Sequence, residues 1–257
     1  MVEINFLCVN SKYRTKRLAP VLIKEITRRV HLQNLWQAVY TAGILLPKPI
    51  AQCTYYHRNI NVQKLLDVKF TYLNPKLNIS RAKIIYKIGK NPTIDYVREM
   101  KKSDVDQVHY LLNNYLKKNF KIHSIFTKEE IKHWFTPLDK VVYTYVVENP
   151  ETLEITDFFS FYSLPSSILQ HNTHHTLYAA YSFFNVATTV SLKELIKNAL
   201  IMAKIKGFDV YNTLNIMENE TILNDLLFGQ GDGTLKYYFY NFQCPQTLPK
   251  DLSLVLM

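Results

Sequence analysis

After residue 103, helix patterns that begin at recognisable N-caps alternate with strand-like runs, and this alternation restricts the possible fold most strongly. Thr127 with Glu130, and Ser191 with Glu194, have the spacing of capping boxes, and each is followed by apolar residues at helical intervals. Strands are expected at residues 141–147, 155–164, 177–186, 208–214 and 235–242. Further helices are expected from residue 105 and over residues 221–227. This order predicts an α+β protein in which helices flank a mixed sheet.

The first part of the chain is expected to hold another helix and several strands. The helix is expected where apolar residues recur every four positions, at Leu18, Leu22, Ile26 and Val30. Short strand pieces are expected at residues 4–9, 36–42, 54–57 and 66–72. The sequence from residue 74 to residue 93 is polar and weakly patterned. It therefore predicts a boundary between a unit of residues 1–73 and a unit of residues 74–257.

The charge of the chain indicates anionic partners. There are 31 Lys and Arg against 21 Asp and Glu, a formal charge of +10. Such a protein attracts nucleic acid, an anionic membrane surface or a phosphorylated small molecule, and charge alone does not choose among them. No apolar run is long enough to span a bilayer, so stable membrane insertion is not expected. Three cysteines without C-x-x-C spacing predict a reducing, cytoplasmic location rather than a disulfide framework.

Positive charge is concentrated between residues 10 and 30, which hold seven basic side chains and one acid, Glu25. Arg14 and Arg17 lie where the helix is expected to begin, and the free N–H groups of a first helical turn bind phosphate. The sequence has no Walker or G-x-G-x-x-G pattern, which excludes a P-loop and a dinucleotide fingerprint. The segment is therefore either a phosphate site at a helix start or a solvated basic helix.

Glycine is concentrated near the C-terminus, where Gly229, Gly231 and Gly233 alternate within six residues. One interpretation is a tight turn capped by Asp232. The other is a backbone that another segment must approach closely, which glycine permits. The sequence leaves both open.

Histidines and cysteines give no clear catalytic signature. His57 lies in an aromatic run, where a lone histidine is more often structural than catalytic. His171, His174 and His175 have no neighbouring ligands at metal-binding spacing, so we expect a surface loop there and no metal site. No nucleophile signature is present.

Two segments resemble the signatures of the protein N-myristoyltransferase (glycylpeptide N-tetradecanoyltransferase) family. The family's E-I-N-F-L-C-x-H-K is similar to EINFLCVNS at residues 3–11, and its K-F-G-x-G-D-G is similar to LFGQGDG at residues 227–233. Asn10 and Ser11 replace His and Lys of the first signature, and Leu227 replaces Lys of the second. Shorter matches lie between them, at residues 14–20, 39–43, 164–166, 179–182 and 207–210.

The resemblance implies two related acetyltransferase-like (GNAT-like) halves. Residues 1–73 then end the N-terminal half, and residues 74–257 form a complete C-terminal lobe. It also implies an acyltransferase that moves a myristoyl group from myristoyl-CoA to the N-terminal glycine of proteins. Myristoyl-CoA is then an acyl-donor substrate, no cofactor is permanently bound, and glycine-initiated peptides are the partners. A monomer that binds no nucleic acid is expected.

Catalytic roles also follow from the resemblance. The backbone N–H groups of Phe6 and Leu7 correspond to an oxyanion hole for the thioester carbonyl, and such donors supply much of the catalysis in acyl transfer. The family's base is the C-terminal carboxylate, which here belongs to Met257. A modest base suffices, because a free α-amino group has a pKa of ~7.7–8.0. Asn5 and Thr41 match positions near the glycine amine.

The resemblance further implies two sets of binding residues. The acyl-CoA contacts correspond to Phe6, Leu7, Cys8, Val9, Thr15, Arg17, Leu18 and Ala19. The peptide groove corresponds to Tyr55, His57, Phe70, Ser166, Tyr181, Asn212, Asp232, Gly233, Leu235 and Leu256.

A competing hypothesis follows from the extent of the match, because most of the family's first half has no counterpart here. The chain is then a truncated or degenerate copy that binds peptide N-termini without catalysis. On this ground we expect weak or absent binding of myristoyl-CoA by the chain alone. Nucleic-acid binding ranks last, since the charge has no accompanying recognition motif.

Overall fold

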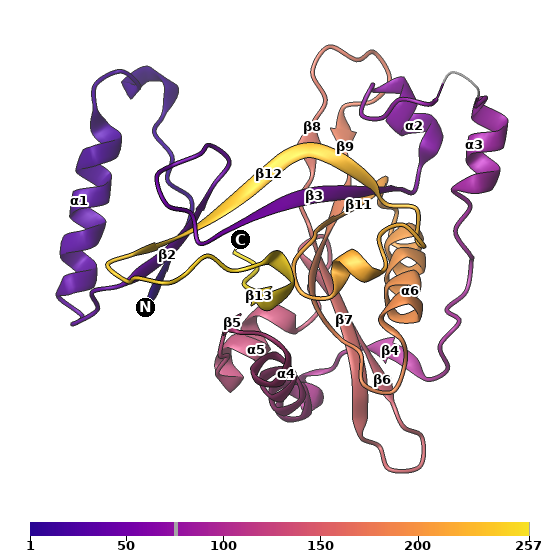
Figure 1. Cartoon of the computed structure of the whole chain (residues 1–257). Coiled ribbons are helices and arrows are strands. Elements are labelled where there is room, and N and C mark those ends of the chain that lie inside the picture. The colour runs from indigo at the N-terminus through magenta and orange to yellow at the C-terminus, as the bar shows by residue number, and fades with distance from the viewer. Residues whose placement is uncertain (75–76, 257) are drawn as a thin grey trace.

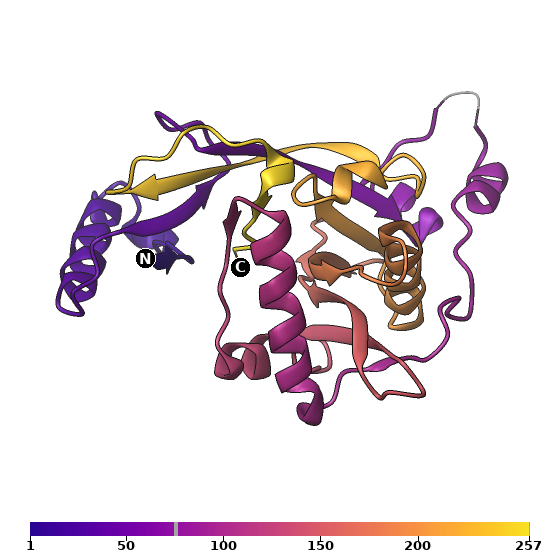
Figure 2. The same ribbon diagram turned by 60° about the horizontal axis from the view of Figure 1, so that its bottom comes forward.

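A computed structural model describes residues 1–74 and 77–256, and these form a large mixed sheet with helices on both faces (Figures 1 and 2). The α-helices are α1 (Leu18–His31), α2 (Val62–Asp67), α3 (Ile79–Ile85), α4 (Val105–Asn119), α5 (Lys128–Phe135) and α6 (Leu192–Ile205). Short 3₁₀ helices are η1 (Ser11–Tyr13), η2 (Lys102–Asp104), η3 (Asn219–Thr221) and η4 (Pro249–Asp251). Among the described residues, no helix is both long and apolar enough to cross a membrane. The predicted α+β architecture is confirmed.

The main sheet runs in the order β1-β2-β12-β3-β11-β10-β7-β6-β4. Its strands are β1 (Val2–Ile4), β2 (Ala38–Ala42), β3 (Ala51–Asn59), β4 (Val97–Glu99), β6 (Val142–Glu148), β7 (Ile155–Ser163), β10 (Ala179–Val186), β11 (Val210–Leu214) and β12 (Gly229–Tyr240). The pairs β1/β2 and β10/β11 are parallel, and the other neighbours are antiparallel. Strands from both sides of residue 73 join in this sheet, and the boundary at that residue stays a prediction.

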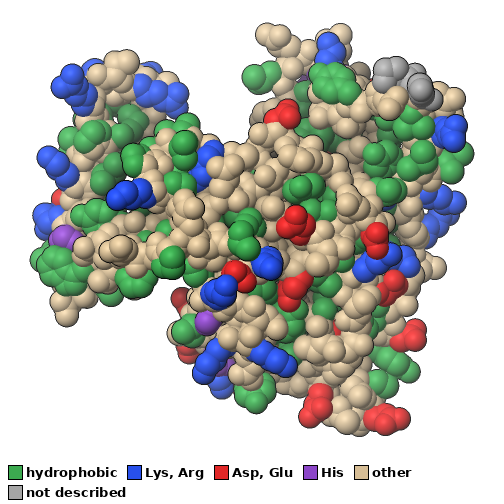
Figure 3. All heavy atoms as spheres, viewed as in Figure 1, with side chains coloured by type: hydrophobic (Ala, Val, Ile, Leu, Met, Phe, Trp, Pro, Cys, Tyr) green, Lys and Arg blue, Asp and Glu red, His purple; other side chains and the backbone are tan. Residues whose placement is uncertain are grey.

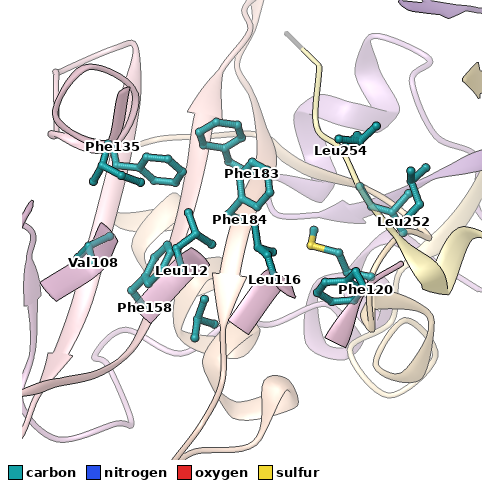
Figure 4. Packing of buried hydrophobic residues seen from close by; sticks show 14 of the residues in the cluster. Val108, Leu112, Leu116, Phe120, Phe135, Phe158, Phe183, Phe184, Leu252 and Leu254 are labelled. Atoms are coloured by element: carbon teal, nitrogen blue, oxygen red, sulfur yellow. The ribbon is translucent and has the colours of Figure 1, made fainter. Parts of the chain in front are cut away.

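Helices α4 and α5 cover one face of the sheet through an apolar core (Figure 4). Val108, Leu112 and Leu116 recur along α4 at helical spacing and are fully buried. They pack with Phe158 of β7 and with Phe135 of α5. The sequence places α5 at this position through the predicted capping box, in which Thr127 and Glu130 bond each other's backbone N–H.

Helix α6 covers the opposite face. Leu195 and Ala199 of this helix pack with Phe159 and Phe161 of β7. Because successive side chains of a strand point to opposite faces, Phe158 and Phe159 belong to different cores. The two faces of the sheet therefore carry separate cores, one beneath α4 and α5 and one beneath α6.

The C-terminal segment is fixed on the α4 face of the sheet. The short strand β13 (Leu252–Ser253) pairs in parallel with β5 (Ile122–His123), directly after α4. Leu252 is fully buried, and Leu254 joins the same core. The Tyr237 hydroxyl on β12 donates a hydrogen bond to the Leu254 carbonyl oxygen at 2.8 Å. The last described residues therefore lie beside the central strands.

Three of the secondary-structure elements expected from the sequence are not formed as predicted. The run at residues 4–9 is not a buried strand, because β1 ends at Ile4 and Phe6 turns the chain with a φ of 56°. Residues 66–72 end α2 instead of forming a strand. The helix expected at residues 221–227 is limited to the end of η3, and turns follow it.

Candidate functional site

A row of side chains crosses neighbouring strands at one level of the sheet. His57 on β3 pairs with Asn212 on β11, and Asn212 pairs with Tyr181 on β10. Tyr181 in turn pairs with Tyr162 on β7. Directly paired residues of neighbouring strands point to the same face of a sheet. These four side chains therefore line one surface, on the face that carries α4.

A pocket lies beside this row, and Asn212, Tyr181 and Tyr162 are part of its lining. Its lining contains five of the residues predicted for the peptide groove, namely Tyr55, Tyr181, Asn212, Leu235 and Leu256. No described residue of the lining has an acidic or basic side chain. The pocket is therefore suited to a neutral chain that makes hydrogen bonds and apolar contacts, with the C-terminal segment as one wall.

His57 is held in one orientation at the edge of the pocket. Its Nδ1 lies 2.6 Å from Oδ1 of Asn212, which is a buried side chain. This close contact joins the His57 ring to the Asn212 amide across the two strands. The ring also meets the edge of Phe70, with centroids 5.4 Å apart. These contacts bring two more predicted groove residues to the site.

The glycine-rich segment is part of β12 and is not a turn, so the interpretation as a tight turn is wrong. Pairing with β3 shifts register between Gln230 and Thr234, which leaves Gly231 and Gly233 in a bulge. A Cβ on Gly231 would overlap the His57 ring, and a Cβ on Gly233 would lie 3.2 Å from Cδ2 of Tyr55. The close approach of the β12 backbone to the His57 ring therefore requires glycine at position 231.

Three tyrosines form the aromatic wall of the pocket. The rings of Tyr162 and Tyr181 stack with centroids 5.4 Å apart, and Tyr55 meets Tyr181 edge-on at 6.4 Å. Burial raises the pKa of Tyr55 to about 12 and raises the pKa of Tyr162 still further. The phenol groups of Tyr55 and Tyr162 therefore stay protonated, and they can hydrogen-bond to the amides of a peptide.

The residues predicted for the oxyanion hole lie directly after β1. The positive φ of Phe6 ends the strand there, so the backbone of Phe6 and Leu7 lies outside the β1/β2 ladder. The Phe6 side chain is 85% exposed. Cys8 is exposed and Val9 half-buried, and the Val9 carbonyl accepts a hydrogen bond from Nε of Arg14 at 3.1 Å.

The remaining predicted acyl-CoA residues surround the start of α1. Thr15 and Arg17 both have positive φ, at 71° and 55°, and Arg17 is the N-cap residue. Its side chain makes no capping hydrogen bond, and the first turn holds no acid. Leu18 and Ala19 are the first helical residues. Such a helix start can receive an anion at its N–H groups.

Of the other predicted catalytic residues, Thr41 and Asn5 lie within the described chain and Met257 does not. Thr41 on β2 pairs directly with Tyr237 on β12, whose hydroxyl binds the C-terminal segment. Asn5 donates a hydrogen bond from Nδ2 to Glu3 at 2.5 Å. Met257, whose carboxylate is the predicted base, lies outside the described residues.

Two predicted groove residues stand apart from the pocket. Ser166 lies on β8 (Ser166–Ser167), which pairs with β9 (Thr176–Leu177) in a separate hairpin and is exposed. Asp232 is exposed in the β12 bulge. Tyr162 and Tyr237 line the pocket but were not predicted. The alternation within the runs 155–164 and 235–242 could have placed Tyr162 and Tyr237 on one face, but not next to each other.

Two family models match the chain. "Myristoyl-CoA:protein N-myristoyltransferase, C-terminal domain" matches residues 67–253, and the corresponding "N-terminal domain" matches residues 1–53. Among curated relatives, a glycylpeptide N-tetradecanoyltransferase from Plasmodium falciparum is 51% identical over 257 residues, and one from Arabidopsis thaliana is 51% identical over 258. Both alignments cover the whole of this chain. The chain spans only 62% and 59% of their lengths.

Solved structures give the same similarity. A Saccharomyces cerevisiae N-myristoyltransferase with bound myristoyl-CoA is 37% identical and superposes with a TM-score of 0.93. The match covers 99% of this chain and 65% of that one.

Proposed function

We propose that this chain, which belongs to the myristoyl-CoA:protein N-myristoyltransferase family, contributes the peptide groove and catalytic groups for myristoyl transfer to an N-terminal glycine. The donor is myristoyl-CoA, and the acceptor is a peptide whose first residue is glycine. The carrying observation is that His57, Asn212 and Tyr181, which are far apart in sequence, form one row beside the C-terminal segment.

In this proposal the peptide binds along the row and over the glycine bulge. Its amides face the phenols of the tyrosine wall and the Asn212–His57 pair. The absence of a side chain at Gly231 lets the His57 ring lie directly against β12. The groove therefore binds by shape and hydrogen bonds rather than by charge.

The transfer step uses main-chain groups in this proposal. The N–H groups of Phe6 and Leu7 bind the thioester oxygen as it becomes negative, a role in which one donor contributes ~2.7–4 kcal/mol. The glycine nitrogen forms the new C–N bond, the C–S bond breaks, and CoA leaves as the thiol. The uncapped start of α1 and the side chain of Arg17 bind phosphate groups of CoA.

The base in this proposal is the carboxylate of Met257. The pocket lining offers no acidic or basic side chain among the described residues, so a base must come from elsewhere. Val255 and Leu256, the described residues that precede Met257, line the pocket, and the hydrogen bond from Tyr237 to the Leu254 carbonyl holds this segment on β12. A carboxylate there accepts the proton that the glycine ammonium loses before attack.

We predict that one alanine appended after Met257 lowers the transfer rate at least ~100-fold, because an amide replaces the carboxylate. Met257→Ala is the matched control, since it changes the side chain and keeps the carboxylate. Its rate should stay within about threefold of the unchanged chain. Mass spectrometry of an acylated glycine peptide measures both, and equal rates for the extended and unextended chains would contradict the role of the carboxylate.

A second candidate function is peptide binding without catalysis. It is favoured by the 62% coverage of the Plasmodium relative and by the exposure of Phe6 and Leu7. Two measurements on the same sample separate the candidates: anisotropy of a labelled glycine-initiated peptide, and its acylation by myristoyl-CoA. Binding with acylation supports transfer, binding alone supports the second candidate, and the absence of both contradicts the groove.

A further inference from the structure

A second cavity lies at the end of the molecule away from α1, where α2, α3 and α6 come together (Figures 1 and 2). Its volume is about 300 Å³. The lining includes Ile60, Lys83, Tyr86, Lys87, Ile88 and Lys204. This lining shares no described residue with the predicted peptide groove, so the cavity is a separate feature.

The cavity and the groove lie on opposite faces of the sheet. Ile60 and Ile88 of the lining pack with the core beneath α6, and Lys204 belongs to α6 itself. The row that contains His57 and Asn212 lies on the face that carries α4. A ligand in the second cavity therefore leaves the groove free.

Three lysines surround the cavity. Lys83 lies in the last turn of α3, Lys87 follows two residues after that helix, and Lys204 lies in the last turn of α6. No described acid pairs with any of them. Nζ of Lys204 donates a hydrogen bond to the Ile88 carbonyl at 2.7 Å, which leaves two of its three N–H groups for a ligand. Figure 3 shows Lys and Arg side chains along the edge of the molecule where Figure 1 places α3.

A fourth positive charge lies behind the lining. Arg58 is 5% exposed, and its guanidinium lies 5.1 Å from the ring centroid of Tyr86. Among the described residues it donates hydrogen bonds to backbone carbonyls alone, at 2.6 Å to Leu226, 2.6 Å to Asn59 and 3.4 Å to Tyr86. Burial lowers the pKa of Arg58 to about 10, so the group stays charged at neutral pH without a carboxylate partner.

The acids bonded to the lining do not neutralise this charge. Asn61 donates a hydrogen bond to Asp209 at 3.1 Å, but Asp209 is already paired with Lys64. Gln63 donates one to Asp67 at 2.9 Å. The ends of α3 and α6 attract cations, which is a purely structural interpretation of the lysines. However, two helix ends carry only about one negative charge together, so an excess of positive charge remains even with Asp67 counted.

We propose that this cavity binds a small organic phosphate. The phosphate group lies among the ammonium groups of Lys83, Lys87 and Lys204, which bind it through charge-assisted hydrogen bonds. The apolar part lies against Tyr86 and Ile60. A volume of about 300 Å³ is at the lower end of the range for small-molecule sites, which favours a compact ligand over a polymer. This binding is independent of the proposed function, since it requires neither the groove nor transfer.

Calorimetric titration of the full chain with phenyl phosphate and with inorganic phosphate tests the proposal. We expect one phenyl phosphate per chain, bound at least ~5-fold more tightly than inorganic phosphate, because its ring is removed from water. Both affinities should fall as salt is added, since the attraction is between charges near the surface. Absence of binding would overturn the proposal, and equal affinities for the two probes would overturn the apolar contact.

A matched pair of double variants locates the phosphate. Lys83→Gln with Lys87→Gln removes two charges from the cavity, whereas Lys117→Gln with Lys118→Gln removes two exposed charges from the last turn of α4. The first pair should weaken phenyl phosphate binding at least ~10-fold and the second less than ~3-fold. Equal effects would show a response to net charge alone and would overturn the proposal.

Two further measurements distinguish other sites and other ligands. Loss of phenyl phosphate binding in Arg17→Gln, with binding retained in the cavity variant, would place the anion at the start of α1 and overturn the proposal. A short single-stranded RNA is the second probe. If it binds more tightly than phenyl phosphate and loses that binding in the cavity variant, the lysines belong to a nucleic-acid surface, which would also overturn the proposal.

Discussion

At the scale of single residues, position 231 requires glycine because the His57 ring lies against it. A side chain there would overlap the His57 ring and force it away from Asn212. We predict that Gly231→Ala costs about 1–3 kcal/mol of folding free energy, as overpacking does. Binding of a glycine-initiated peptide should weaken at least ~10-fold. Urea unfolding and anisotropy measure the two effects.

Gly43→Ala is the control for that change. No atom lies within 4 Å of a Cβ built on Gly43, and its φ is not in the positive range. Stability should change by less than about 0.5 kcal/mol, and peptide affinity should not change. Similar losses in both variants would show that the bulge is not specifically constrained.

The raised pKa of Tyr55, about 12, predicts a loss of stability at alkaline pH. An unfolded tyrosine titrates near ~10, so between pH ~10 and ~12 the unfolded chain releases a proton that folded Tyr55 retains. Ionisation then favours unfolding, and stability that is constant below pH ~10 falls through this window. Urea unfolding at several pH values should show a smaller fall in Tyr55→Phe. An identical fall in both proteins would contradict a buried, neutral Tyr55.

At the scale of elements, helix α5 depends on its capping box. The Thr127 hydroxyl accepts a hydrogen bond from the Glu130 N–H at 3.2 Å, and the Glu130 carboxylate accepts one from the Thr127 N–H at 2.7 Å. Thr127→Ala should cost about 0.5–2 kcal/mol in urea unfolding. Thr27→Ala, on the exposed α1, should change stability by less than about 0.5 kcal/mol. A larger loss in Thr27→Ala would contradict this account.

Elements with their own local signals were predictable from the sequence, and elements set by distant contacts were not. Helices α5 and α6 have the expected N-cap residues, Thr127 and Ser191. The strand expected at residues 4–9 was wrong, because an apolar run indicates that the residues need burial but does not specify a strand. Phe6 takes a left-handed conformation that nothing in the surrounding sequence requires.

At the scale of the whole molecule, the site depends on a strand order that local patterns do not reveal. Strand β12 inserts between β2 and β3, which brings the glycine segment against His57 and Tyr237 opposite Thr41. The resemblance to the family named the groove residues, and the alternation of side chains along the strands could have indicated their faces. Neither gave the distances between the groove residues. Which strands become neighbours in the sheet is decided by the packing of the two cores.

The most direct test of the account is where a substrate peptide binds. A glycine-initiated peptide with a photoreactive side chain would be irradiated with the full chain and myristoyl-CoA, and the attached residues identified by mass spectrometry. We expect attachment to the row on β3, β11 and β10, around His57, Asn212 and Tyr181, and its reduction in Gly231→Ala but not Gly43→Ala. Attachment elsewhere on the molecule, or attachment unaffected by Gly231→Ala, would contradict it.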